Sequence, residues 1–275
     1  MDSPLVRWAG GKRLLTNKLL RYVPEKFGTY YEPMIGGGAL FFALKPARAI
    51  LSDINQDLMN FYGIVKRRPR AFYLRIRRLR VHKKNYYSVR QWNPTDPLNR
   101  AVRFFYLARL SWNGLYRVNR AGQFNVPFGG RNPRKLISWD RLRVASRSLQ
   151  TVKLRSGDFE EMVRRAKRND FVYLDPPYPK GATDGNGFAR YSATGFKTED
   201  HKRLAACAQR LAGKGVFVML TEAAQKDILR LYPDHFKIEV VRTRSLIAAH
   251  GDYRREVREA IITSYDPKGK GRSSP

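Results

Sequence analysis

The sequence contains very little cysteine and histidine. Its 275 residues include one cysteine, Cys207, and four histidines. A single cysteine excludes a disulfide framework and indicates a reducing compartment, so we expect a cytoplasmic protein. Four scattered histidines and one cysteine form no zinc motif, and we expect no metal cofactor. Cys207 lies among alanines, as a small helix-packing residue does, so we do not expect a cysteine nucleophile.

Long apolar runs are also missing. No stretch of 18 apolar residues is present, which excludes a transmembrane helix. The opening Met1-Asp2-Ser3-Pro4 lacks a signal-peptide pattern. A content of 43% hydrophobic and 12% aromatic residues can still build a core, so the chain is not a disordered basic tail. The length suits one large or two small domains.

Acidic residues are scarce as well. The chain has 23 Asp and Glu against 54 Lys and Arg, a net charge of +31. An enzyme for a small acidic substrate does not need such a field, and self-repulsion destabilises the folded state. The imbalance therefore favours a polyanionic partner, above all nucleic acid. Compositional drift toward arginine is the alternative at this point.

The positive charge is concentrated in one segment. Residues 66–150 contain 22 basic and 2 acidic residues, a net +20, which leaves +11 for the other 190 residues. A solvated helix face usually mixes both signs. This segment therefore indicates a nucleic-acid-binding unit inserted into a more ordinary domain.

Outside that segment, predicted strands alternate with predicted helices. One helix is expected at Lys202–Leu211, where Leu204, Ala208 and Leu211 share a face. The alternation predicts an α/β protein with an open, mostly parallel sheet. The expected strands are Thr29–Glu32, Ala49–Asp53, Phe171–Asp175, Val216–Leu220 and Glu259–Tyr265.

Three of these strands end in an acid: Glu32, Asp53 and Asp175. Ligands of open α/β sheets bind outside the carboxyl ends of the strands. Glu32 is followed by Pro33 and by Gly36-Gly37-Gly38, and glycines allow close backbone approach to a ligand. Asp53 follows Glu32 by 21 residues, near the spacing of acids that bind ribose hydroxyls. The pattern favours a nucleoside-containing cofactor, although glycines also simply end strands.

The sharpest motif is Asp175-Pro176-Pro177-Tyr178. It can be a strand ended by prolines, with Asp as a turn former. It also suits a specific chemistry, because an amine on a heteroaromatic ring is a poor nucleophile whose lone pair is delocalised. The Asp175 carboxylate and the Pro176 carbonyl can accept its two N–H bonds and free the lone pair, while the prolines stiffen the loop. Tyr178 offers a face on which an extruded base can stack.

Several motifs, in the same order, resemble those of the Dam-type DNA adenine methyltransferases. The resemblance is co-linear and covers nearly the whole chain, in the arrangement with the target domain before the catalytic strand. Asp-Pro-Pro-Tyr alone is shared with other amino-methyltransferases, whereas the whole set is specific. The motifs are Arg7-Trp8-Ala9-Gly10-Gly11-Lys12, Glu32 to Gly38, Leu51-Ser52-Asp53-Ile54-Asn55, Trp112 to Asn119, Gly122 to Gly129, Gly157-Asp158-Phe159 and Asp175 to Tyr178.

The resemblance implies a domain organisation. A Rossmann-like methyltransferase domain would comprise residues 1–59 and 139–265. A mainly helical target-recognition domain bearing a β-hairpin would occupy residues 60–138, and residues 266–275, rich in Gly, Ser, Lys and Pro, would form a disordered tail. We expect monomeric action on double-stranded DNA and no membrane partner.

The resemblance also implies S-adenosylmethionine as the cofactor. Trp8, Ala9, Gly10 and Lys12 would line its methionine end. The family's pocket floor matches Glu32, Pro33, Gly36, Gly37 and Gly38. Asp53 would hold the ribose hydroxyls, Asp158 and Phe159 would contact the adenine, and Asp175 would border the same pocket. Gly157-Asp158 is also an ordinary turn pair.

The basic segment contains a predicted hairpin. Leu115–Asn119 and Phe124–Phe128 flank a glycine-containing turn, and a two-stranded ribbon fits the DNA major groove. In the family this hairpin reads GATC, with Arg117 suited to a guanine edge and Trp112 to a wedge beside a flipped base. Hairpin core for Trp112 and a phosphate contact for Arg117 are the alternatives. The implied DNA-binding residues are Arg7, Trp112, Asn113, Leu115, Arg117, Asn119, Asn125 and Pro127.

The chain departs from the family pattern after the fourth expected strand. The polar pair that is often Ser-Asn is replaced by Thr221-Glu222. The late segment from Arg244 is more apolar than usual at Leu246 to Ala249. Neither change touches the Asp-Pro-Pro-Tyr chemistry.

The sequence therefore predicts a site-specific adenine methyltransferase. Asp175, Pro176, Pro177 and Tyr178 would act on the N6 amine of a flipped adenine in GATC. The lack of a suitable cysteine nucleophile argues against a cytosine ring-carbon methyltransferase. Two alternatives stay open: the same chemistry on RNA or another DNA sequence, and a catalytically silent DNA-binding protein.

Overall fold

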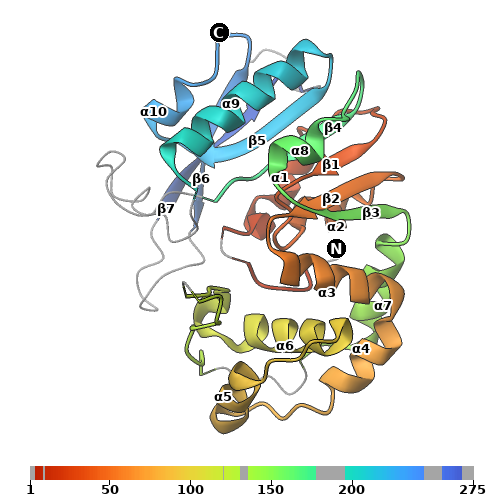
Figure 1. Cartoon of the computed structure of the whole chain (residues 1–275). Helices are drawn as coiled ribbons and strands as arrows, with labels where there is room; N and C mark the ends of the chain where they lie inside the picture. The colour runs from red at the N-terminus through yellow and green to blue at the C-terminus, as the bar shows by residue number, and fades with distance from the viewer. Residues whose placement is uncertain are drawn as a thin grey trace.

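A computed structural model describes residues 4–8, 10–119, 121–130, 136–177, 196–244 and 256–267. The predictions for Ala9, for Tyr178, for Leu246 to Ala249 and for the tail from residue 268 lie outside the described residues. Figure 1 shows a sheet with helices on both faces and a helical part below it.

The sheet has seven strands in the order β3-β2-β1-β4-β5-β7-β6. The strands β1 to β5 run parallel, and β7 is antiparallel to both β5 and β6. The mostly parallel α/β sheet expected from the sequence is confirmed. The strands are β1 Tyr30–Glu32, β2 Ala49–Asp53, β3 Val152–Ser156, β4 Phe171–Leu174, β5 Phe217–Ala223, β6 Lys237–Arg244 and β7 Glu256–Thr263.

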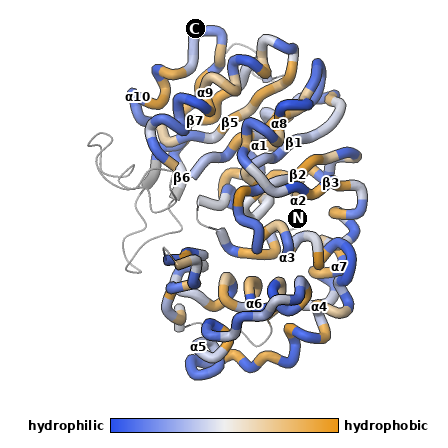
Figure 2. The backbone as a smooth tube through the Cα atoms, viewed as in Figure 1, coloured by the Kyte–Doolittle hydropathy of each residue, from blue (hydrophilic) through white to orange (hydrophobic). Residues whose placement is uncertain are grey.

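Alternate residues of the strands enter two separate hydrophobic cores. Tyr30, Phe171 and Met219 pack on one face with α1, α2 and α3, whereas Tyr31 and Val172 pack on the other with α8, α9 and α10. Figure 2 shows the hydrophobic run along β5, as expected for a strand covered on both faces. The helices are α1 Thr16–Leu20, α2 Ala39–Leu44, α3 Gln56–Arg67, α8 Phe159–Val163, α9 Thr198–Gly213 and α10 Lys226–Leu229.

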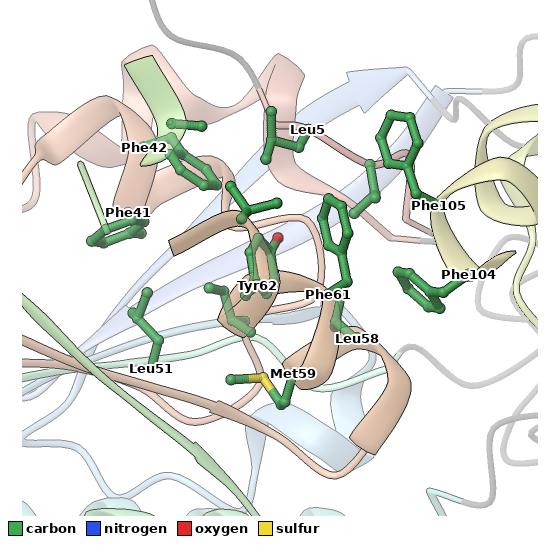
Figure 3. Close-up of a cluster of buried hydrophobic side chains, with 14 of the residues drawn as sticks. Leu5, Phe41, Phe42, Leu51, Leu58, Met59, Phe61, Tyr62, Phe104 and Phe105 are labelled. Carbon is green, nitrogen blue, oxygen red and sulfur yellow. The ribbon is translucent and has the colours of Figure 1, made fainter. Parts of the chain in front are cut away.

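The basic segment folds into helices that share a core with α3. The Phe61 ring of α3 packs on Phe104 and Phe105 of α6, with centroids 5.7 and 5.4 Å apart (Figure 3). At the start of α6, the Asp96 carboxylate accepts the Asn99 N–H at 2.9 Å and Pro97 is the first helical residue. The helices of the segment are α4 Pro69–Ile76, α5 Lys83–Gln91, α6 Pro97–Leu110 and α7 Trp139–Ser148.

The proposed boundary between residues 59 and 60 falls inside α3, whereas that between 138 and 139 coincides with the start of α7. The division into domains stays a prediction. None of the helices in the described ranges is both long and apolar enough to span a bilayer.

The hairpin is less regular than predicted. Instead of two continuous strands, the described residues form two isolated bridges, Val118–Phe124 and Ser111–Phe128. Pro127 has no N–H to donate, and the Val126 carbonyl accepts the Tyr86 hydroxyl of α5 at 3.0 Å instead of a neighbouring strand. The predicted hairpin is present, because the antiparallel bridge Val118–Phe124 is flanked by backbone hydrogen bonds from Asn119 to Gln123 and from Asn125 to Arg117, but its strands are shorter than expected.

Candidate active site

The three predicted acids all lie at the carboxyl ends of the parallel strands, which we call the carboxyl edge of the sheet. Strand order reverses between β1 and β4, which pair in parallel through Tyr30–Phe171, so the carboxyl ends of both strands flank this crevice. Glu32 is the last residue of β1, Asp53 the last of β2, and Asp175 directly follows β4. The predicted placement of Glu32, Asp53 and Asp175 at the same sheet edge is therefore confirmed.

Asp175 is held through one of its two carboxylate oxygens. The Lys12 ammonium lies 2.6 Å from Oδ1, and the Thr221 hydroxyl donates to the same oxygen at 2.8 Å. Thr221 lies on β5, and its hydroxyl also contacts the Tyr173 hydroxyl at 2.9 Å. No described residue is hydrogen-bonded to Oδ2 of Asp175. The arrangement orients the carboxylate through Oδ1.

Among the residues that the structure describes, several carboxylates lie close to Lys12 and to one another. Lys12, 4% exposed, also lies 4.0 Å from Glu259 of β7, while Glu32 is buried beside Asp53 and Asp175. Burial raises the pKa of Glu32 to about 8, although hydrogen bonds from the Tyr30 hydroxyl and the Phe41 backbone oppose the shift. Burial also raises the pKa of Asp175, with the Lys12 ammonium opposing it. A cationic ligand would stabilise these carboxylates in their charged form.

The glycine turn after β1 is closed by Asp53. Gly36 and Gly38 adopt positive φ angles of 46° and 69°, which a larger residue rarely tolerates. The Gly36 N–H donates to Asp53 Oδ2 at 3.0 Å, and the Gly36 carbonyl accepts the Tyr62 hydroxyl at 2.8 Å. The other Asp53 oxygen accepts the Asn55 N–H at 2.9 Å. The sequence predicted both the turn and the acid, and the structure joins them directly.

Trp8 connects the glycine turn to the hairpin. A Cβ on Gly36 would lie 2.6 Å from the Trp8 ring, so only glycine fits there. The other side of Trp8 stacks on Tyr116, with centroids 6.0 Å apart and planes at 17°. The adjacent Arg7 lies against Gly114 of the hairpin, where a Cβ would come within 2.7 Å of it. The opening motif therefore contacts both the predicted cofactor turn and the predicted DNA-reading segment.

Side chains of the hairpin have distinct environments. Arg117 is exposed and donates from Nε to Asn125 Oδ1 at 2.8 Å, which holds one end of the guanidinium. Asn119 instead caps the turn, since its Oδ1 accepts the Ala121 and Gln123 N–H groups at 3.0 and 2.9 Å. The ring of Trp112 is 45% exposed rather than buried as hairpin core.

The remaining predicted hairpin residues lie around this loop. Asn113 has a left-handed backbone with φ at 51°. Leu115 packs against the main core, and the Pro127 carbonyl accepts the Trp112 N–H at 2.9 Å. Their DNA contacts stay predictions.

Asp158 and Phe159 lie at the start of α8, beyond β3. The Asp158 carboxylate accepts the Glu160 N–H at 3.0 Å and pairs with Arg203 of α9, also at 3.0 Å. Arg203 lies over the buried Phe159 ring, 5.1 Å from its centroid. The described side chains thus already engage Asp158, and its contact with a cofactor stays a prediction.

Sequence reasoning missed the residues that support the acids. Tyr30 bonds to Glu32, Tyr173 bonds to Thr221, and Thr221 bonds to Asp175. A signal was available, because each tyrosine precedes its acid by two residues and therefore points to the same face of the strand. Thr221 stood out only as a departure from the Ser-Asn pair, and the expectation that this departure does not touch the Asp-Pro-Pro-Tyr motif was wrong, because the Thr221 hydroxyl donates to Asp175.

The chain is similar to known proteins over most of its length. The profile of the D12 class N6 adenine-specific DNA methyltransferases matches residues 8–247. A type II methyltransferase of Lactococcus lactis subsp. cremoris is 38% identical over an alignment of 275 positions that covers 95% of each chain. A type II methyltransferase of Methanocaldococcus jannaschii is 32% identical, with 96% of this chain and 99% of that protein covered. The DNA adenine methylase of Escherichia coli K12 is 33% identical, with 97% and 96% covered.

Similarity to solved structures is weaker. TrmN from Thermus thermophilus aligns with 91% of this chain and 48% of its own, at 11% identity and a TM-score of 0.40.

Proposed function

This chain belongs to the D12 class of N6 adenine-specific DNA methyltransferases, and we propose that it methylates the N6 amine of adenine within GATC in duplex DNA. The observation that carries the proposal is the Asp175 carboxylate, oriented by Lys12 and Thr221 through Oδ1 and followed by the Pro176 carbonyl.

Asp175 and Pro176 would act on the target amine. Oδ2 of Asp175 and the Pro176 carbonyl each accept one N–H, which turns the nitrogen lone pair toward the methyl donor. S-adenosylmethionine, when bound, would supply the methyl group; N6 would bond to the methyl carbon as the carbon–sulfur bond breaks, with the bonding pair left on sulfur. The amine then loses one proton to solvent by way of the Asp175 carboxylate. Tyr178, outside the described residues, would stack on the base, with Pro177 stiffening the loop.

The residues at the sheet edge fit S-adenosylmethionine. This cofactor supplies a methyl group on a positively charged sulfonium, and the buried carboxylates around Lys12 suit a cation. Glu32 with the Gly36 to Gly38 turn would form the pocket floor, and Asp53 would accept ribose hydroxyls. Trp8 and Gly10 would border the methionine end, and Asp158 with Phe159 the adenine.

The hairpin would read the sequence. Arg117, steadied by Asn125, suits the two acceptors of a guanine edge. The exposed Trp112 suits the space left by a flipped adenine. Leu115 and Pro127 would contact bases nearby, and Arg7 would reach the first base pair.

The test uses purified protein, S-adenosylmethionine and unmethylated plasmid. Digestion with methylation-sensitive and methylation-dependent GATC nucleases reports the site, and mass spectrometry of the hydrolysed DNA reports N6-methyladenine. Protection at GATC with N6-methyladenine is the expected result. N6-methyladenine without GATC protection would move the proposal to another sequence, and its absence would leave RNA methylation or a silent DNA-binding protein.

A further inference from the structure

The end of β5 carries a buried pair of ionisable residues that the proposed chemistry does not use. Glu222 and His201 of α9 are 0% and 1% exposed, and His201 Nδ1 lies 3.1 Å from Glu222 Oε1. The Tyr232 hydroxyl lies 3.5 Å from the same oxygen. Within the described chain, Glu222 Oε2 and His201 Nε2 have no hydrogen-bond partner. Such a pair is weak evidence for stability, because apolar residues of similar volume often replace one without loss.

The pair lies one residue from the group that orients Asp175. Successive residues of a strand point to opposite faces, so Glu222 points toward α9 while Thr221 points toward Asp175. The Thr221 hydroxyl donates to Asp175 Oδ1 at 2.8 Å. Anchoring the Glu222 side chain to α9 therefore restrains the part of the strand from which Thr221 reaches the carboxylate.

His201 also connects, through aromatic contacts, to Phe159 of the predicted cofactor site. The rings of His201 and Phe196 form a T-shaped pair, with centroids 4.9 Å apart and planes at 87°. Phe196 in turn packs on Phe159, with centroids 6.2 Å apart. Phe159 is one of the residues expected at the cofactor adenine. His201 thus lies between the strand end beside Asp175 and the aromatic residues near α8.

We propose that Glu222 and His201 are positioning residues that hold Thr221, and through it Asp175 Oδ1, so that Oδ2 faces the target amine. The inference rests on the proposed function. Both residues act through Thr221 and touch neither reacting atom. Thr221 and Glu222 stand where the family pattern has Ser-Asn, so this chain would orient Asp175 with a different set of hydrogen bonds, in which His201 of α9 holds Glu222.

The test is a double-mutant cycle on Glu222→Gln and Thr221→Val. Each single variant should lower kcat by about tenfold, equivalent to about 1.4 kcal/mol, with KM for DNA unchanged. If Glu222 acts through Thr221, the double variant should lose no more than Thr221→Val alone, because coupled residues are not additive. His201→Gln tests the same step if Glu222→Gln does not fold.

Asp170→Asn is the matched control. Asp170 is also a buried acid, 2% exposed, and accepts the Thr29 N–H at 2.8 Å and the Lys167 N–H at 3.0 Å. It precedes β4, at the opposite end of the strand from Asp175. Asp170→Asn should lower Tm without changing kcat.

The outcomes separate the two proposals. If Glu222→Gln lowers Tm as Asp170→Asn does but leaves kcat unchanged, the pair is a core element and the inference is overturned. Additive losses in the double variant would also overturn it, since Glu222 would then act independently of Thr221. A wild-type protein that makes no N6-methyladenine on any DNA would overturn the proposed function and this inference together.

Discussion

At the scale of single residues, Asp175 is the most exacting test of the chemistry. Asp175→Asn keeps the shape but replaces an acceptor with an amide, so kcat should fall by about 10²- to 10⁴-fold. DNA binding should stay within about threefold, because phosphate contacts supply most of the affinity. Tritiated methyl incorporation and a filter-binding titration measure the two effects. Methyl transfer at the wild-type rate would show that this carboxylate does not act on the amine.

The same substitution has a cost in stability. Lys12 is 4% exposed and 2.6 Å from Asp175, so the variant leaves a buried ammonium with a weaker partner. Breaking a buried pair destabilises by about 3–5 kcal/mol, and Tm should fall accordingly. Lys12→Met combined with Asp175→Asn should recover part of the lost Tm and none of the activity. This control separates the fold from the chemistry.

Glu32 predicts a pH dependence of stability. Its pKa is about 8 in the folded protein against an ordinary value of 4.5, so the folded state binds more protons between these values. Stability from this group is fully present below pH 4.5 and is lost as pH rises to 8, by up to about 1.4 kcal/mol per unit. Glu32→Gln removes this titration, so the Tm of the variant minus that of the wild type should increase as pH rises from 6 to 8.5.

Calorimetry in matched buffers measures this difference. S-adenosylmethionine should shrink the gap at pH 8.5, because a bound cation favours the ionised Glu32. A difference in Tm that does not vary with pH would contradict the assignment of the raised pKa to Glu32.

At the scale of elements, the hairpin is where we expect substitutions to change the DNA sequence that the enzyme selects. Arg117→Ala should cost about 1–3 kcal/mol at the guanine it reads and relax discrimination there. Asn125→Ala should have a smaller effect in the same direction, because it frees the Arg117 side chain that it holds at 2.8 Å. Methylation rates on duplexes with single-base changes measure both.

Arg78→Ala is the control for this prediction. Arg78 is exposed after α4, so its loss should weaken binding on all sequences equally. A uniform loss for Arg117→Ala would instead make Arg117 a phosphate contact.

The central strands were predictable, and the edge strands were not. A continuous apolar run, such as Phe171–Leu174, predicts a strand that is buried on both faces. The strands β3 and β6 lie at the two ends of the strand order and mix charged with apolar residues, so no such run marks them in the sequence. The acids at the sheet edge followed from topology alone. Their partners did not, because the Thr221 and Lys12 contacts with Asp175 join residues far apart in the chain.

At the scale of the whole molecule, the charge of +31 is unevenly compensated. On α9, Arg203 pairs with three carboxylates, those of Asp158, Glu160 and Asp200. Exposed basic residues in the ranges 67–70 and 75–84 form no ion pair with any described acid. Uncompensated charge of this kind attracts phosphates and releases their counterions.

The salt dependence of DNA affinity can compare the basic surface of the α4–α5 region with a basic surface elsewhere on the protein. Each phosphate contact adds about −0.9 to the slope of log K against log salt concentration. One variant carries Gln at four exposed positions between the end of α4 and the first turn of α5: Arg77, Arg78, Lys83 and Lys84. The control carries Gln at four exposed positions before β4, at the sheet edge opposite Asp175: Arg164, Arg165, Lys167 and Arg168.

Both variants lose four positive charges, so a difference between them reports position and not net charge. We expect the first variant to flatten the slope by about one unit or more for nonspecific duplex DNA, and the control to leave it unchanged. Fluorescence anisotropy across a salt series measures both slopes. Equal flattening would mean that the charge acts as a diffuse field, and a shallow wild-type slope would leave arginine-rich composition as the better account of the excess.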